Sequence, residues 1–337
     1  AMRCALGVLS AVGVLRSAPS ARWATARMGG AGVVDSAVHV WSDGQEPYPW
    51  AMAPPAELAE TVTFEKLYET ASAAGVTGAL IVQPINHKYD HSYTDLALKT
   101  YPNFFRGMGL IDPSLSPEDA VSVVNTLHSR GYVGVRFNAG AFSEYGGVAS
   151  PTGRAVYSRC GELGMVVGLM AFGGLPPHLG AVRVLLSSSP KTKLVVDHFG
   201  FFRQPATGGL LGDSASNDED AWKEIVGLSA YPQVYIKVSA LFRTSAEAPP
   251  FSDLASRVAD LLAAYGADRL LWGSDFPFCT TGGQSVTSVA QTYEQAVAVP
   301  TFWRAEGLDE AALGMLMGGN AARLFGFGRC VDAVQAV

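Results

Sequence analysis

The sequence predicts a single α/β domain folded as a (β/α)8 TIM barrel. Short, nearly uninterrupted apolar runs recur from Val33 onward with helix-like segments between them, which is typical of a parallel sheet buried on both faces. Eight such strand-then-helix units follow one another, and no G-x-G-x-x-G turn favours the alternative, a doubly wound sheet. The chain has 337 residues, of which 48% are hydrophobic and 16% charged, so it suffices for one large core.

The predicted strands are the eight runs of apolar residues. The second run ends at Pro84, whose ring cannot donate to a neighbouring strand. In chain order the runs cover residues 33–40, 78–83, 105–111, 133–137, 165–170, 193–198, 234–239 and 269–275.

The predicted helices lie between these strands and carry start and stop signals. The segment Phe64–Ala74 is followed by Gly75, a residue that readily ends a helix. Ser116 can cap a helix that begins at Pro117. Further helical patterns cover residues 152–164, 181–187, 220–228 and 253–265, and the Gly- and Ser-rich segment 203–219 is expected to be a lid or a surface insertion.

The N-terminal residues differ from the rest of the chain. Residues 1–34 contain four Arg and no Asp or Glu, a composition typical of a transit peptide for a chloroplast or mitochondrion. A secretory signal and a disordered tail are the alternatives, and the protein is cytoplasmic if the segment does not target it. We therefore expect a targeting peptide or tail over 1–32, the barrel over 33–327 and a C-terminal tail over 328–337.

Composition excludes several classes of protein. A net charge of −6 argues against nucleic-acid binding. No apolar stretch reaches the roughly 20 residues that span a bilayer. The four Cys form no C-x-x-C pair, which makes a zinc finger or a disulfide scaffold unexpected. A small-molecule substrate is the expected partner, and a homo-oligomer is compatible with the sequence.

Polar residues with catalytic chemistry follow the predicted strands. In a (β/α)8 barrel the C-terminal ends of the strands form the active site. The candidates are His39 and Trp41 at strand one, Gln83 and His87 at strand two, Arg136 at strand four, His198 at strand six, Lys237 at strand seven and Asp275 at strand eight. We expect a catalytic pocket there, although a strand-end His can also be a packing residue and Asp275 a helix cap.

Two kinds of chemistry are compatible with these residues. His39, His198 and Asp275 are ordinary ligands for a divalent metal, which would lower the pKa of a bound water. Without a metal, Asp275 would activate water directly while His and Arg136 stabilise the oxyanion. Lys237 lies in an apolar strand, and a buried ammonium needs a partner or a function.

Five motifs in chain order together resemble the amidohydrolase-related (amidohydrolase 2) family. They are DSAVHVW at 35–41, VVDH at 195–198, VYIKVS at 234–239, WGSDFP at 272–277 and GNAARLF at 319–325. The branch that contains 2-pyrone-4,6-dicarboxylate lactonase is the most similar, and the segment 79–88 resembles plant and algal members. The resemblance implies an amidohydrolase-like barrel that hydrolyses a lactone or amide or, in one branch, decarboxylates an acid.

The sequence departs from this family at two expected ligand positions. The family's strand-one pattern is His-x-His, and here Ala37 replaces the first His, so that only His39 matches. The strand-five segment 168–171 has no His, Lys or Glu. The resemblance therefore implies one zinc or manganese ion on His39, His198 and Asp275, or no metal at all.

The leading hypothesis is a hydrolase of a small anionic lactone or related cyclic ester or amide. Asp275 is the predicted base, with His198 and His39 polarising the carbonyl group. Arg136 and Lys237 are predicted to hold the substrate carboxylate or stabilise negative charge, and Gln83, His87 and Trp41 to contact substrate. The alternatives are a non-catalytic barrel that binds or scaffolds, suggested by Ala37, and a decarboxylase.

Overall fold

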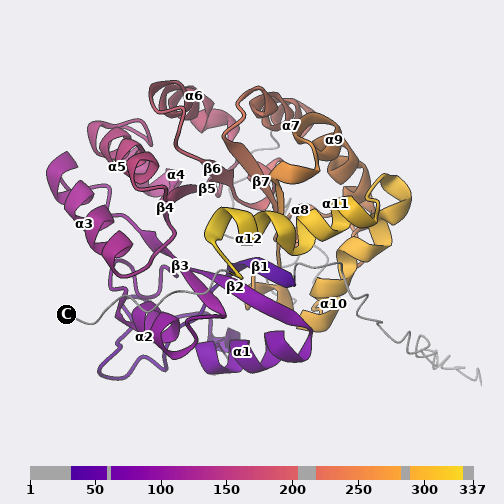
Figure 1. Cartoon of the computed structure of the whole chain (residues 1–337), viewed down its shortest axis with the longest axis horizontal. Helices are drawn as coiled ribbons and strands as arrows, with labels where there is room; N and C mark the ends of the chain where they lie inside the picture. Colours follow the sequence, from indigo (N-terminus) through magenta and orange to yellow (C-terminus); the bar gives the residue numbers. More distant parts are fainter. Residues whose placement is uncertain (1–31, 59–61, 204–217, 282–288, 329–337) are drawn as a thin grey trace, which may run out of the picture.

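The computed structural model describes residues 32–58, 62–203, 218–281 and 289–328. The predicted targeting segment, nearly all of the C-terminal tail and most of the predicted 203–219 loop therefore lie outside the described residues. Eight parallel strands form one sheet in the order β1 to β8, and helices surround it (Figure 1). The prediction of a (β/α)8 TIM barrel is confirmed.

The strands coincide with the eight apolar runs, and each pairs with the next along the chain. Nearly all their side chains are buried, because helices cover the outside of the sheet and side chains fill its interior. Their bounds are β1 Val33–Val38, β2 Val76–Val82, β3 Phe105–Leu110, β4 Gly134–Asn138, β5 Val166–Met170, β6 Leu194–Val196, β7 Val234–Ser239 and β8 Leu270–Gly273.

The main helices follow the strands on the outside of the barrel. They are α1 Phe64–Ala73, α2 Ser92–Thr100, α3 Pro117–Ser129, α5 Pro151–Glu162, α6 Leu179–Ser188, α7 Asp218–Gly227, α9 Ala255–Tyr265 and α10 Tyr293–Ala298. Two short helices, α4 Ala139–Ser143 and α8 Leu241–Thr244, directly follow strands, and α11 Glu310–Gly314 and α12 Asn320–Phe325 end the domain.

Local capping explains where several helices begin and end. The Ser116 hydroxyl accepts from the Asp119 amide at the start of α3, as predicted. Gly75 follows α1 with φ of 81°, a conformation that costs glycine little.

The barrel closes between β1 and β8. The His39 amide donates to Phe276 O at 2.7 Å, and the Asp275 amide donates to Ala37 O at 2.9 Å. At the end of the barrel where the strands begin, α12 lies across the barrel (Figure 1), and Phe325 and Phe327 pack against apolar residues of the strands. The closed seam matters for function because the strand-one and strand-eight candidates lie along it.

Three predicted strand ends were wrong by two residues. The first, sixth and eighth runs were expected to continue to residues 40, 198 and 275, but the strands end at 38, 196 and 273. His198 and Asp275 instead have φ of 54° and 61°, in the left-handed region. An apolar run does not reveal where the backbone leaves a strand, because that depends on the turn that follows.

Among the helices that the structure describes, none is both long and apolar enough to cross a bilayer.

Candidate active site

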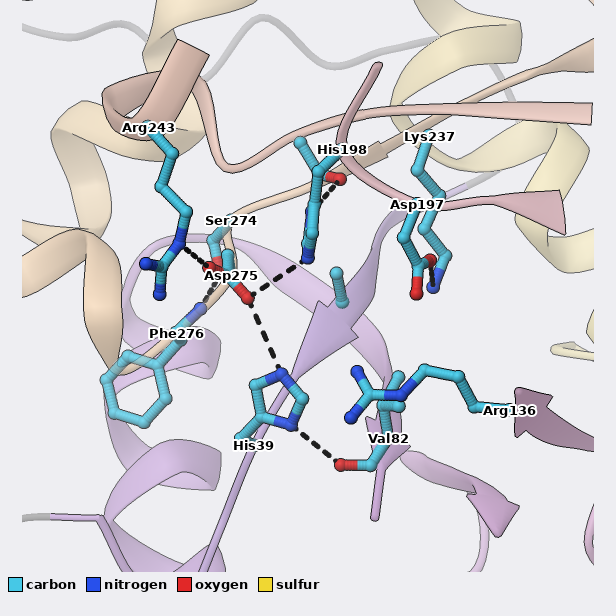
Figure 2. A network of polar contacts seen from close by, with 12 residues as sticks. His39, Val82, Arg136, Asp197, His198, Lys237, Arg243, Ser274, Asp275 and Phe276 are labelled. Atoms are coloured by element: carbon cyan, nitrogen blue, oxygen red, sulfur yellow. Dashed lines mark hydrogen bonds and ion pairs between the residues drawn. The ribbon is translucent and has the colours of Figure 1, made fainter. Parts of the chain in front are cut away.

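The central predicted residues converge at the C-terminal end of the barrel (Figure 2). His39 follows β1, His198 follows β6 and Asp275 follows β8. His39 Nε2 lies 3.5 Å and His198 Nε2 3.7 Å from the same carboxylate oxygen, Asp275 Oδ1. All three side chains are buried. The structure therefore brings together two imidazoles and one carboxylate from three separate strands.

Both imidazoles are held by hydrogen bonds at their other ring nitrogen. His39 Nδ1 lies 2.8 Å from Val82 O. A carbonyl oxygen only accepts, so Nδ1 carries a proton, and Nε2 is the ring nitrogen that faces Asp275. His198 Nδ1 lies 2.8 Å from the Ser239 hydroxyl, which can donate or accept, so either nitrogen of a neutral His198 can carry its proton.

Asp275 is held in its charged form. Burial by itself would raise the pKa of Asp275, but His198, His39 and Arg243 outweigh it and hold that pKa well below its ordinary value. Burial lowers the pKa of His198 to about 4, against the pull of Asp275 and Asp197. Near neutral pH the site thus contains an ionised Asp275 beside a neutral His198, with Arg243 as its permanent positive neighbour.

Arg243 is a site residue that the sequence analysis missed. It lies in α8, directly after β7, and its Nε is 3.2 Å from Asp275 Oδ2. Its guanidinium also lies 5.0–5.7 Å from three aromatic ring centres, those of Phe172, Phe242 and Phe278. The available signal was one Arg directly after the apolar residues 240–242, which follow a predicted strand, where an unpaired charge would be costly.

A second charged group lies on the other side of the site. Lys237 Nζ is 3.0 Å from Asp197 Oδ1, and both side chains are essentially inaccessible to solvent. Burial would raise the pKa of Asp197, but Lys237 above all lowers it. Figure 2 shows the Arg136 guanidinium near this pair, on the side of the site away from Arg243. Arg136 Nε has no hydrogen-bond partner among the described residues.

Two of the predicted substrate-binding side chains have hydrogen-bond partners within the protein. Gln83 donates through Nε2 to Lys88 O and Asp90 O, and its Oε1 accepts from Thr94, so its amide holds the loop after β2. His87 Nε2 accepts from the Ser42 amide at 3.3 Å. Burial lowers the pKa of His87, which favours the neutral ring that this contact requires.

Trp41, the remaining predicted contact, is fully buried beside Phe278. Its indole nitrogen has no hydrogen-bond partner among the described residues.

Left-handed backbone conformations cluster at this end of the barrel. His198, Ala240 and Asp275 follow β6, β7 and β8, and their φ values are 54°, 50° and 61°. Each costs a non-glycine residue roughly 1–2 kcal/mol. Such strain is retained where the surrounding contacts impose it, and it often accompanies function.

The residues present do not fit a bound divalent metal. Although His39, His198 and Asp275 converge, no group of three or more His, Cys, Asp or Glu side chains in the described part of the chain is arranged to hold an ion. Ala37 offers no ligand on β1, and the segment 168–171 offers none on β5. Arg243 lies against Asp275 Oδ2, so a cation there would meet a positive charge.

Comparison with known proteins gives one family and several relatives. The model of the family described as amidohydrolase matches residues 34–327. A 4-sulfomuconolactone hydrolase from Hydrogenophaga intermedia is 28% identical over 219 residues, which covers 64% of this chain and 65% of that protein. The match thus spans slightly less than two thirds of the relative's own length.

Solved structures share the fold over almost their whole length. A candidate 2-pyrone-4,6-dicarboxylic acid hydrolase from Pseudomonas putida is 26% identical, with a TM-score of 0.65, and the match covers 89% of this chain and 99% of that one. An amidohydrolase from Burkholderia multivorans, solved with bound zinc, is 20% identical with the same TM-score and covers 87% of this chain and 99% of that one. At 20% identity the latter likeness concerns the fold alone.

Proposed function

Because the chain belongs to the amidohydrolase family, we propose that it hydrolyses a small anionic lactone or a related cyclic ester or amide. The observation that carries this proposal is the buried Asp275 carboxylate, with two imidazole nitrogens 3.5 and 3.7 Å from one of its oxygens. The relatives named as hydrolases of sulfomuconolactone and of pyrone dicarboxylic acid support the ring ester of a lactone as the bond that is broken.

Water activation is assigned to Asp275 together with His39. With its Nδ1 proton donated to Val82 O, a neutral His39 offers Nε2 as an acceptor. Nε2 and Asp275 Oδ1 are 3.5 Å apart, close enough for one water molecule to donate a hydrogen to each. The water would then direct a lone pair toward the lactone carbonyl carbon, and Asp275 would accept its proton as the new C–O bond forms.

Stabilisation of the carbonyl oxygen is assigned to His198 and Arg136. When the Ser239 hydroxyl donates to His198 Nδ1, the neutral ring carries its proton on Nε2 and can donate it to the developing oxyanion. The buried Arg136 guanidinium adds a positive charge on that side of the pocket. The tetrahedral intermediate then expels the ring oxygen, which takes the proton held by Asp275, and a hydroxy acid leaves.

The charge of the pocket supports an anionic substrate. Arg136, Lys237 and Arg243 provide three positive charges against the two carboxylates of Asp197 and Asp275. Because Lys237 is paired with Asp197 and fully buried, we assign contact with the substrate's negative charge to Arg136 and give Lys237 a supporting role. A divalent metal has no step in this scheme.

The test is turnover of a panel of neutral and carboxylated lactones by the wild-type protein and by Asp275→Asn. We expect ring opening by the wild type and a decrease in kcat of about 10³-fold in the variant, the range for loss of a positioned general base. Asp119→Asn, an exposed Asp at the start of α3, is the control and should retain activity. Equal turnover by Asp275→Asn and wild type would refute the role of Asp275.

A non-catalytic binding barrel is the second candidate function. Ala37, where related sequences are expected to have His, favours it. If the pocket is otherwise intact, Ala37→His should increase turnover or metal affinity. If the wild type opens no lactone and the variant gains neither property while remaining folded, the binding role is preferred.

A further inference from the structure

A buried carboxyl group that the reaction does not use lies in the seam between β1 and β8. Asp35 is the third residue of β1, and its side chain is inaccessible to solvent. Its hydrogen bonds within the described part of the chain are with residues other than His39 and His198, and the one with the Ser274 amide holds the backbone that leads to Asp275. Burying a carboxyl group is costly, so its hydrogen-bond partners indicate what it does.

Donors from Ala37, Ser274 and Tyr293 converge on the Asp35 carboxyl group, and Ser274 contributes its hydroxyl as well as its amide. Asp35 Oδ1 accepts from the Ala37 amide at 3.1 Å and from the Ser274 amide at 2.9 Å. Its Oδ2 accepts from the Tyr293 hydroxyl of α10 at 2.7 Å. The Tyr293 ring in turn packs edge-on against Phe276, with ring centres 5.6 Å apart.

These contacts form a closed ring that includes the backbone of Asp275. Asp35 Oδ1 accepts from the Ser274 amide. The next amide along the chain, that of Asp275, donates to Ala37 O at 2.9 Å, and the Ala37 amide donates back to Asp35 Oδ1. Asp275 has φ of 61° inside this ring. β1 therefore holds this unfavourable backbone conformation through two amides, those of Ser274 and Asp275. Within this ring of hydrogen bonds, the Asp35 carboxyl group is the one side chain that takes part.

We propose that Asp35 is a positioning residue, which holds the Ser274–Asp275 backbone so that the Asp275 carboxylate stays between His39 and His198. Asp35 does not touch the reacting atoms in this proposal, and its catalytic effect is transmitted through Asp275. The proposal rests on the proposed function for its kinetic readout, while its structural content is independent of the substrate.

The adjacent residue provides a matched control. Ser36 is also fully buried in β1, and its hydroxyl donates to Trp272 O across the same seam at 2.6 Å. It therefore stabilises the seam without contacting the amides of Ser274 or Asp275. If Asp35 only stabilised the barrel, the loss of either side chain would have the same kind of effect.

The experiment compares four variants: Asp35→Ala, Asp35→Asn, Tyr293→Phe and Ser36→Ala. For each we measure the melting temperature, kcat and KM on the best lactone, and hydrogen exchange of a peptide covering residues 273–279. We expect Asp35→Ala to lower kcat about 100-fold with little change in KM, the effect of misplacing a catalytic group by about 1 Å. Asp35→Asn keeps an oxygen for the two amides and should restore most of kcat. Ser36→Ala should lower the melting temperature but change kcat less than about twofold.

Hydrogen exchange gives a readout that does not require turnover. The 273–279 peptide should exchange faster in Asp35→Ala but not in Asp35→Asn or Ser36→Ala. If Asp35→Ala does not fold, Tyr293→Phe, which removes one donor, should lower kcat about fivefold without raising KM. Equal kcat losses in the Asp35 and Ser36 variants, or unchanged exchange in Asp35→Ala, would overturn the proposal. Absence of wild-type turnover together with selective exchange would refute the proposed function and leave the positioning role supported.

Discussion

At the residue scale, the site depends on how a buried carboxylate is kept ionised and aimed. Asp275 is surrounded by His39, His198 and Arg243, and their combined effect on its pKa exceeds that of burial. The only permanently charged member of this set is Arg243, whose planar guanidinium contacts Asp275 Oδ2 while it packs among three aromatic rings. A lysine has the same charge but cannot reproduce both contacts.

Arg243→Lys is therefore predicted to lower kcat/KM for lactone hydrolysis by about 10- to 100-fold, because the charge that supports Asp275 is displaced. The measurement is steady-state turnover of the best substrate. Arg257→Lys is the matched control, since Arg257 also pairs with a carboxylate and packs against the Phe202 and Trp222 rings, but it contacts α7 instead of Asp275. Equal losses in the two variants would show that the effect on Arg243 is one of packing alone.

His91, the second histidine after β2, gives a prediction for stability. Burial lowers the pKa of His91 from 6.5 to about 4, and its Nε2 accepts from the Leu110 amide at 3.0 Å. The folded state therefore favours the neutral ring, whereas the unfolded chain binds a proton below its pKa of 6.5. The contribution of His91 is complete above that value and is lost as the pH falls toward 4.

Between about pH 7.5 and about pH 5, His91 should remove about 2 kcal/mol from the free energy of unfolding. Urea unfolding at the two pH values measures how much of this free energy is lost on acidification. The loss should be about 2 kcal/mol smaller in His91→Gln than in the wild type. His128→Gln, in which an exposed histidine of α3 is replaced, should keep the wild-type pH dependence. The prediction fails if both variants retain it.

At the element scale, neighbouring strands bring opposite charges together inside the barrel. Lys237 of β7 lies beside Asp197, which directly follows β6, and both are fully buried. The desolvation of two charges offsets much of their attraction, so the pair adds little net stability. The loss of one partner is different, because the other charge then remains buried without compensation.

Lys237→Met is thus predicted to reduce the free energy of unfolding by about 3–5 kcal/mol. The double variant Lys237→Met with Asp197→Leu should be more stable than Lys237→Met alone, since the Asp197 carboxylate is then no longer buried without Lys237. Chemical unfolding of the two single variants and the double variant measures the coupling. If the double variant has the summed loss of the two singles, the two side chains do not interact in this way.

At the scale of the whole molecule, closure of the barrel brings distant parts of the chain to one point. His39 and Asp275 are 236 positions apart in the sequence, and they meet because the ends of β1 and β8 are joined by backbone hydrogen bonds. The fold is shared with proteins that contain zinc, but the donors here do not form a metal-holding group in the described part of the chain.

We therefore predict that prolonged dialysis against a chelator changes lactone turnover by less than about twofold, because the proposed water activation requires only protein groups. Elemental analysis of the dialysed protein verifies that zinc and manganese are absent. A loss of activity that added zinc or manganese restores would show that a metal takes part in the reaction.

Much of the site was predictable because barrel geometry relates chain position to spatial position. Once eight strands were recognised, residues at their C-terminal ends had to face one pocket, and His39, His198 and Asp275 do meet there. The sequence did not show that Gln83 and His87 also hydrogen-bond within the protein, since a polar residue after a strand looks the same whatever its side chain contacts. Arg243 was missed because it lies in the helix after β7 rather than in the strand.

The number and order of the strands could be predicted from the sequence alone, because alternating apolar runs and helical patterns indicate which segments are buried. The sequence also predicted that His39, His198 and Asp275 would lie together, as they do. The contacts between individual atoms depend on the three-dimensional fold. The two Nε2 atoms face Asp275 Oδ1, Arg243 contacts Oδ2, and Asp35 binds the amide before that of Asp275. These contacts join residues from different strands, and local sequence patterns carry no information about the turns and ring orientations that bring them together.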